Sequence, residues 1–444
     1  MHMNKWFGKY FCGFAFIKEF SKRRIVLFFS ILLLFSLLVF STFSFASRDL
    51  FNYINIGLVA ILSILIIVYQ IIYEKIYVTS FCVLLVCFCL AIIISTLLNG
   101  RLFNLSKTVF LISLMSLTVF QFAKNKNVTE LLLLGFLVGG TMFCVYYIVY
   151  YWSDIIHFSA LTIKDRIGDY FDNQNGVARD FVFLGIIAAY FSIKTKKYYG
   201  LLYSVLMFIL IATTGSISNL LSYLVVLLVL PFVFFGKKGK IVTAIILIIS
   251  IGIILLLLQI PSLSYFKNRL LNIFSTFFGN SGTQIDYSAR DRFEYAVDAF
   301  KLFASRPLFG YGPGGVISYS SGGYAHNNFA ELLADYGLVG FVFFEAVIIR
   351  LLCSSYKKKK DNYSLCIFGI ALYLFIFQFF LVTFNIKIDY LLFAVLFGYI
   401  ERNNTGIIEL AFDKTSKKII FVFNEMSIFN KHGLSDTSYY SISI

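Results

Sequence analysis

Residues 131–150 read LLLLGFLVGGTMFCVYYIVY, a stretch without a single charge. A helix needs about 20 predominantly apolar residues to cross the hydrocarbon core of a bilayer, so this stretch predicts a membrane-spanning helix. Comparable stretches begin near Ile25, Ile54, Ile76, Thr108, Val177, Leu201, Ile217, Ile241, Gly337, Tyr363 and Ile388. We therefore predict an all-α integral membrane protein with about twelve transmembrane helices.

The composition agrees with this prediction. Hydrophobic residues make up 59% of the 444, charged residues make up 14%, and the mean hydropathy is +0.83, as in polytopic membrane proteins. We expect a basic cytoplasmic segment over residues 1–24, a membrane domain over 25–400 and a cytoplasmic tail over 401–444. The first span lacks a small-residue cleavage site and predicts a retained anchor. The tail's Ile-Ile-Phe-Val-Phe run is too short to span, and we expect it to pair locally or stay mobile.

The basic residues predict the orientation. About 25 of the 38 Lys and Arg fall in every second connection between spans, and cytoplasmic loops carry such an excess. An even number of spans with both termini in the cytoplasm follows, which places polar loops over residues 152–176 and 261–328 on the outer face. The net charge of +15 is then a topology signal and a contact for anionic membrane lipid, and we expect no nucleic-acid partner.

The motifs of several common sites are missing from the sequence. None of the seven cysteines lies in the two outer loops, so neither a disulfide framework nor a zinc site is expected. The sequence also has no Asp-x-Asp pair, P-loop, H-E-x-x-H or G-x-S-x-G. We therefore expect no metal site and no cofactor.

The sequence predicts an amphipathic helix in the second half of the longer outer loop. Phe293, Val297, Phe300 and Phe303 recur at helical spacing, which indicates a helix lying on the membrane surface or against the bundle. Pro307 is expected to end it. A Gly-Tyr-Gly-Pro-Gly-Gly turn follows at residues 310–315, where backbone can approach a ligand closely, or which is an ordinary loop.

His326 precedes a second predicted helix. Apolar residues recur at helical spacing after it, and Gly337 is a plausible break before the next span. A helix N-terminus lowers the proton affinity of a histidine, which would keep the imidazole neutral and able to act as a base. A surface or capping histidine is the alternative.

Arginines are the other candidate groups. Arg290, Arg292 and Arg306 lie in the longer outer loop and Arg166 in the shorter one, while Arg179 and Asp180 lie just inside the next span. Intramembrane ions either pair with one another or bind a ligand. Arginine forks suit phosphate and diphosphate groups, and histidine suits proton transfer. The combination predicts transfer from a phosphate-activated donor at the outer face.

At these residues the chain resembles the O-antigen ligase and polymerase family of bacterial membrane glycosyltransferases. The resemblance runs from about residue 165 to 344. It rests on Arg292-Phe-Glu-Tyr, Arg306-Pro-Leu-Phe-Gly-Tyr-Gly-Pro-Gly, His326-Asn-Asn-Phe, Gly337, Gly340, and the segment from Arg166 to Asn175. One departure is that many relatives carry an arginine after the Thr-Gly-Ser turn, whereas Ile217 follows Ser216 here.

The resemblance implies metal-independent transfer of glycan from undecaprenyl diphosphate at the outer face of the bacterial cytoplasmic membrane. His326 would be the catalytic base and Arg292 would engage the donor diphosphate. The resemblance and the composition of the loops together make further residues candidates for binding substrate: Arg166, Arg179, Arg290, Arg306, Asn175, Asn327, Gly310 and Gly312.

Two reactions of this family stay open. A polymerase joins lipid-linked repeat units, and a ligase transfers the finished chain to lipid A core. We favour the polymerase, acting with a chain-length regulator and a flippase as candidate partners. A flippase for the same lipid-linked sugars is an alternative of another class, since intramembrane Arg179 and Asp180 would suit transport.

Overall fold

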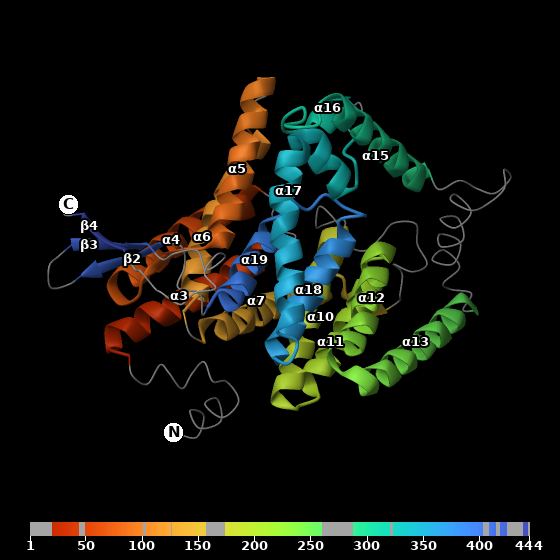
Figure 1. Cartoon of the computed structure of the whole chain (residues 1–444). Coiled ribbons are helices and arrows are strands. Elements are labelled where there is room, and N and C mark those ends of the chain that lie inside the picture. Colours follow the sequence, from red (N-terminus) through yellow and green to blue (C-terminus); the bar gives the residue numbers. More distant parts are fainter. Residues whose placement is uncertain are drawn as a thin grey trace.

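The computed structural model describes residues 20–43, 49–100, 104–125, 127–156, 174–259, 287–319, 323–402, 408–413, 418–423 and 438–442. Most of these residues are helical (Figure 1). The helices are α3 (Lys22–Thr42), α4 (Asp49–Tyr73), α5 (Ser80–Asn99), α6 (Asn104–Ala123), α7 (Val128–Tyr150), α8 (Trp152–Ile156), α10 (Gln174–Thr195), α11 (Tyr199–Thr213), α12 (Ile217–Phe234), α13 (Gly236–Gln259), α15 (Tyr287–Ser305), α16 (Gly315–Tyr319), α17 (Asn328–Lys357), α18 (Asn362–Phe377) and α19 (Lys387–Ile400).

Every one of the predicted apolar stretches contains or adjoins a helix. Seven helices in the described part are long and apolar enough to cross a membrane, namely α3, α4, α5, α7, α10, α12 and α17. Helices suit such sequences because their backbone groups are satisfied internally where no water is present. The all-α membrane class is confirmed, while the exact number of spans and the side on which the termini lie stay predictions.

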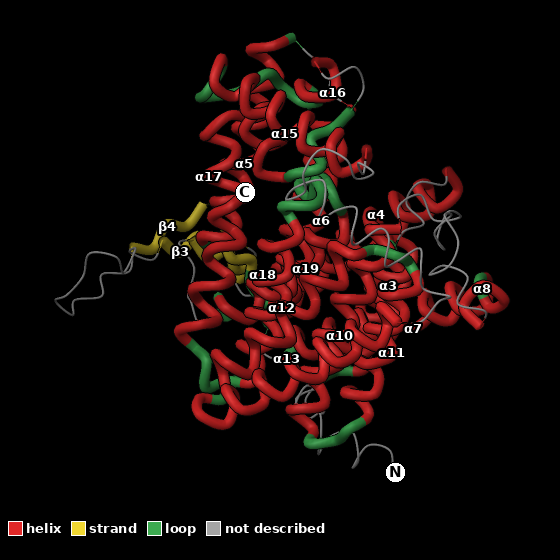
Figure 2. Tube along the Cα trace, turned by 90° about the vertical axis from the view of Figure 1, so that its right-hand side faces the viewer, coloured by secondary structure: helices red, strands yellow, loops and turns green. Residues whose placement is uncertain are grey.

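The bundle is held by helix pairs that are distant in sequence. α6 packs on α19, α5 packs on α17, and α3 packs on α7. Aromatic rings lie in these contacts: Phe88 of α5 lies against Phe344 of α17 with 5.3 Å between ring centroids. Both views place α15 and α16 at one end of the bundle, beside the ends of α5 and α17 (Figures 1 and 2).

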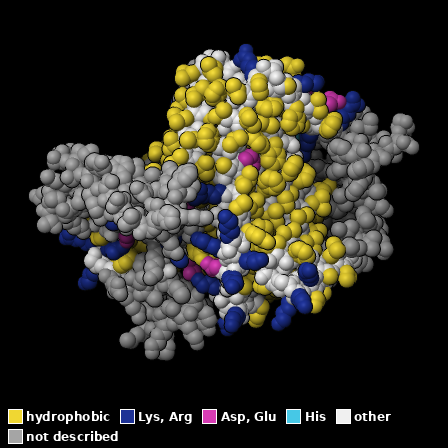
Figure 3. Space-filling model, viewed as in Figure 1, with side chains coloured by type: hydrophobic (Ala, Val, Ile, Leu, Met, Phe, Trp, Pro, Cys, Tyr) yellow, Lys and Arg dark blue, Asp and Glu magenta, His cyan; other side chains and the backbone are white. Residues whose placement is uncertain are grey.

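The surface is that of a lipid-facing bundle. Hydrophobic side chains cover the central face over α17 and α18, and Lys and Arg gather along the lower edge (Figure 3). On α17, Leu338, Val342 and Ile349 are all exposed. Apolar surface of this extent suits lipid rather than water.

A small sheet joins the tail to the α4–α5 connection. Strands β1 (Ile76–Val78), β2 (Ile408–Asp413), β3 (Lys418–Phe423) and β4 (Ser438–Ile442) pair antiparallel in that order. The local pairing expected for the Ile-Ile-Phe-Val-Phe run is confirmed in β3. Ile76 opens a strand rather than a span, and the helix begins at Ser80.

Candidate functional site

The candidate site lies in a part of the molecule that we call the polar lobe: α15, the turn over residues 306–314, α16, and residues 323–336 at the start of α17. It has its own small core of Ala299, Leu302, Val316, Ala325, Ala330 and Ala334. α15 ends at Ser305, shortly before Pro307, as predicted. The lobe therefore has a hydrophobic cluster separate from that of the bundle.

The buried face of α15 differs from the predicted one. Ala299 and Leu302 are buried, whereas the side chains of Phe293 and Phe300 are 60% and 47% exposed. Small alanines allow the close approach of α15 to the lobe core, which the larger rings would prevent. α15 packs against α17 through this face, as in the alternative that places the helix against the bundle, and Phe293 and Phe300 stay exposed on its other side.

A kink at Gly337 divides α17, as the sequence predicted. Gly337 has φ 66° and ψ −168°, and a Cβ there would lie 2.3 Å from the carbonyl carbon of Leu308. Glycine is required because an L side chain rarely adopts this φ and would collide with backbone. Residues 328–336 thus form a short rim helix, set apart from the span that follows.

The turn over residues 306–314 forms hydrogen bonds with the backbone groups that lose their helical partners at the kink. Leu338 N–H donates to Pro307 O at 2.8 Å and Val339 N–H to Leu308 O at 3.2 Å, in place of the helical acceptors. Those acceptors, the carbonyls of residues 334 and 335, accept instead from the N–H groups of residues 311 and 312, each at 2.8 Å. The exchange satisfies all four donors within the protein.

Asp335 fixes the rest of the turn. Its buried carboxylate accepts from Gly314 N–H at 2.8 Å and from Val316 N–H at 3.2 Å. Gly310 N–H donates to Arg306 O at 3.1 Å. The N–H groups of Gly310, Gly312 and Gly314 are therefore engaged by protein acceptors, and the turn acts as a clamp on α17.

Arg306 and Arg290 both lie on the surface of the lobe with protein partners. Arg306 donates to the side-chain oxygen of Asn99 on α5 and stands over the ring of Tyr311, 4.5 Å from its centroid. Arg290 pairs with Glu294 one turn along α15 at 2.8 Å. Arg306 thereby ties the turn to α5.

His326 and Arg292 lie within electrostatic reach of each other, although they are 34 positions apart in the sequence. Arg292 lowers the pKa of His326 through its charge, so the two side chains are electrostatic neighbours. His326 Nδ1 and Arg292 Nε are both buried and make no hydrogen bond to any described residue. These two nitrogens are the strongest candidates in the lobe for contacting a substrate.

The electrostatics of His326 keep its imidazole neutral. Burial of the ring, and secondly the charge of Arg292, lower the pKa of His326 from 6.5 to about 4. The imidazole is therefore neutral at neutral pH. The ring of Tyr324 lies against it, with 3.9 Å between centroids; burial raises the pKa of Tyr324, so its hydroxyl also stays protonated.

The asparagines after His326 hold the helix start. Asn327 caps α17 by accepting from Ala330 N–H at 3.0 Å. Asn328 is buried, donates its N–H to Gln378 O at 2.8 Å, and accepts from Thr383 N–H at 2.7 Å. Both asparagines bond within the protein, so they fix the helix start that directly follows His326.

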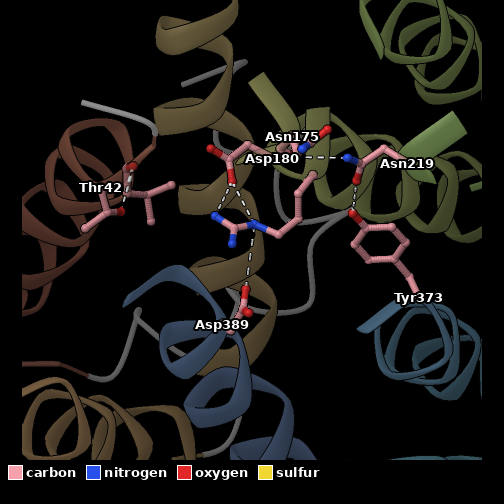
Figure 4. A network of polar contacts seen from close by, with 8 residues as sticks. Thr42, Asn175, Asp180, Asn219, Tyr373 and Asp389 are labelled. Carbon is pink, nitrogen blue, oxygen red and sulfur yellow. Dashed lines mark hydrogen bonds and ion pairs between the residues drawn. The ribbon is translucent and has the colours of Figure 1, made fainter. Parts of the chain in front are cut away.

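Arg179 lies in a separate, deeply buried ionic cluster (Figure 4). Its Nη2 is 3.2 Å from Asp180 Oδ1 and its Nε is 3.9 Å from Asp389 Oδ1 of α19. All three side chains are at most 6% exposed, and Arg179 Nη1 has no hydrogen-bond partner among the described residues. The pairing that the sequence left as one alternative is thus present.

A polar network beside this cluster includes the Thr-Gly-Ser turn. Ser216 Oγ donates to Asn175 Oδ1 at 2.8 Å, and Asn219 Nδ2 donates to Asn175 O at 3.0 Å. Tyr373 of α18 donates to Asn219 Oδ1 (Figure 4). Gln378, the partner of Asn328, lies five residues after Tyr373, about 7.5 Å along α18. One helix therefore links the Arg179 region to the His326 segment.

Other candidates gain or lose support through their position. Arg166 lies outside the described residues. Asn175 is held by the network just described. The sequence reading assigned no role to Glu331, Asp335, Asn99 or Gln378, although each holds part of the lobe in place. Two acids four residues apart, at 331 and 335, in a largely apolar helix are the sequence signal that could have pointed to Glu331 and Asp335.

Comparison with known proteins supports the resemblance. Residues 202–344 match the family model described as O-antigen ligase. The matched segment contains Arg292, the glycine turn and His326, but neither Arg166 nor Arg179. No curated protein matches the chain.

Proposed function

We propose that this protein is a membrane glycosyltransferase that polymerises oligosaccharide repeat units carried on undecaprenyl diphosphate. The observation that carries the proposal is the neutral, half-buried His326 within electrostatic reach of Arg292, in the segment that matches the O-antigen ligase family. We place the reaction at the outer face of the bacterial cytoplasmic membrane, where the predicted topology puts the polar lobe.

In the proposed reaction, His326 accepts the proton of the acceptor sugar hydroxyl. The acceptor oxygen then forms a bond to the anomeric carbon of the donor, and the bond from that carbon to the diphosphate oxygen breaks. The electron pair leaves with the diphosphate, and the guanidinium of Arg292 stabilises the charge that develops there. Arg166, Arg179 and Asn175 are candidates for a second contact to the donor.

The polymerase reaction is preferred to ligation because the chain keeps the Arg292–His326 pair while Ile217 replaces the expected arginine. We propose further that no divalent metal takes part, since arginines supply the positive charge. A chain-length regulator and a flippase are the proposed partners.

Variants of the two central residues test the enzyme. We expect His326→Ala and Arg292→Ala each to abolish long polysaccharide while the protein still inserts in the membrane. Lys301→Ala is the matched control on the same helix, because Lys301 is exposed and paired with Asp298; it should retain most of the polymer. Normal polymer in the His326 variant would remove this residue from the mechanism.

A strain deleted for the gene separates the alternatives. Core carrying one repeat unit would identify the polymerase, and full-length chains stranded on the lipid carrier would identify the ligase. Repeat units accumulating on the cytoplasmic side of the membrane would identify the flippase, which the buried Arg179 cluster would suit.

A further inference from the structure

His326 has an unusual backbone conformation with φ 50°. L residues other than glycine seldom occupy this left-handed region, and asparagine, aspartate and histidine are the commonest of those that do. Such a conformation persists only where the surrounding structure fixes it. The question is which groups fix the backbone on either side of His326.

Two side chains from the first turns of α17 do so. On one side, Asn327 is anchored as the N-cap by its bond to Ala330 N–H at 3.0 Å. On the other, Glu331 Oε2 accepts from Ala325 N–H at 2.6 Å. Ala325 and Glu331 are only 1% and 3% exposed. The backbone of His326 is therefore held between two anchored neighbours.

The same anchor sets the surroundings of the imidazole. Ala325 belongs to the small lobe core, and Tyr324, next to it in the chain, lies against the His326 ring. Gly323 packs under the ring of Tyr295, three residues after Arg292 on α15. A shift of Ala325 would therefore move the ring of His326 away from both Tyr324 and Arg292.

We propose that Glu331 is the positioning residue of the catalytic base, acting through the Ala325 N–H as a hydrogen-bond acceptor. This inference rests on the proposed function only for its effect on rate, because its effect on the position of His326 can be measured without activity. A glutamine at residue 331 would keep a carbonyl acceptor at the same reach, whereas alanine would leave the N–H of Ala325 without one.

The structural test uses a chain in which His326 is the only histidine, the other three being replaced. Modification of His326 by diethyl pyrocarbonate is followed by peptide mass spectrometry. We expect slow modification in this background and with Glu331→Gln, and at least about tenfold faster modification with Glu331→Ala as the ring leaves its half-buried position against Tyr324. Equal rates in all three would overturn the proposal.

The functional test compares kcat and the pH profile. A displacement near 1 Å can lower a rate by about 10²-fold, so we expect Glu331→Ala to lose kcat to that extent with little change in KM. The acid limb of the pH profile of Glu331→Ala should also move toward pH 6.5, the ordinary pKa of histidine. Burial lowers the pKa of His326 in the native protein, and the displaced ring would lose that effect. Glu331→Gln should restore both values. A kcat loss in Glu331→Ala that Glu331→Gln fails to restore would overturn the acceptor role.

Glu401→Gln is the matched control, because Glu401 is also a buried glutamate but contacts Arg350 and Ser80, outside the polar lobe. It should leave the modification rate of His326 unchanged. If His326→Ala retained activity while Glu331→Ala still exposed the ring, the proposed function would fail and the positioning role would stand.

Discussion

Replacing Arg292 with glutamine tests the electrostatic part of the candidate site, because it removes the charge and keeps a polar side chain. The proton-accepting form of His326 is present above its pKa, which burial and Arg292 lower from 6.5 to about 4. In the native protein we therefore expect kcat/KM to be flat near neutral pH and to fall by half at about pH 4.

The size of the change in the variant follows from the order of the two causes. Burial is the larger one, so removal of the cation restores less than half of the difference between about 4 and 6.5. The acid limb of Arg292→Gln should rise, but by less than about 1.2 pH units. If Arg292 also stabilises the leaving diphosphate, kcat should fall by about 10²–10³-fold.

The assay measures initial rates with a radiolabelled lipid-linked repeat unit at subsaturating concentration, from roughly pH 3.5 to 8, so that kcat/KM is obtained. Samples returned to neutral pH must recover activity, which separates titration from unfolding. Lys301→Gln removes an exposed charge from the same helix, serves as the control and should leave the limb in place. An acid limb near pH 6.5 in the native protein, or one that Arg292→Gln leaves unmoved, would refute the reasoning.

Three further predictions concern the clamp and the chemistry. Gly337→Ala should lower the melting temperature and the yield of folded protein. A left-handed φ costs about 1–2 kcal/mol for an L residue, and the added Cβ would meet Leu308 at 2.3 Å. An unchanged melting temperature would contradict the clamp. Asp335→Asn should lower the free energy of unfolding by about 1.5–3 kcal/mol, because the N–H groups of Gly314 and Val316 lose a charged acceptor. Chemical denaturation measures this loss. An unchanged free energy of unfolding would leave the carboxylate without a structural role. Activity of the purified enzyme should survive EDTA, and loss that a divalent ion restores would overturn the metal-free proposal.

The sequence predicted the local features of the fold well. Apolar stretches of about 20 residues have one stable form in a bilayer, and the helices lie where these stretches do. The end of α15 before Pro307 and the break at Gly337 were also predictable, because proline and glycine act on the backbone at their own positions.

Features that depend on residues far apart in the chain were not predictable. β1 pairs with β2, with Ile76 opposite Leu410, and no local periodicity encodes such a partner. The buried face of α15 depends in the same way on its neighbours: the spacing of Phe293 and Phe300 indicates a helix face, but only the lobe core shows that alanines are buried instead. Glu331 was missed because its partner is a backbone N–H.

The contacts also give a physical reason for the two halves of the sequence resemblance to occur together. The turn over residues 306–314 contributes the donors and acceptors that a helix broken at Gly337 lacks. The break, in turn, leaves residues 328–336 as a rim helix that begins at the Asn327 cap. Its Glu331 side chain anchors Ala325, so the residues on both sides of His326 are fixed. The glycine turn thus acts on the chemistry through α17 rather than by binding phosphate with its own N–H groups, which are already engaged. Mutations in the turn should therefore lower stability and displace His326 together, whereas mutations of Arg292 should lower the rate in a protein of unchanged stability.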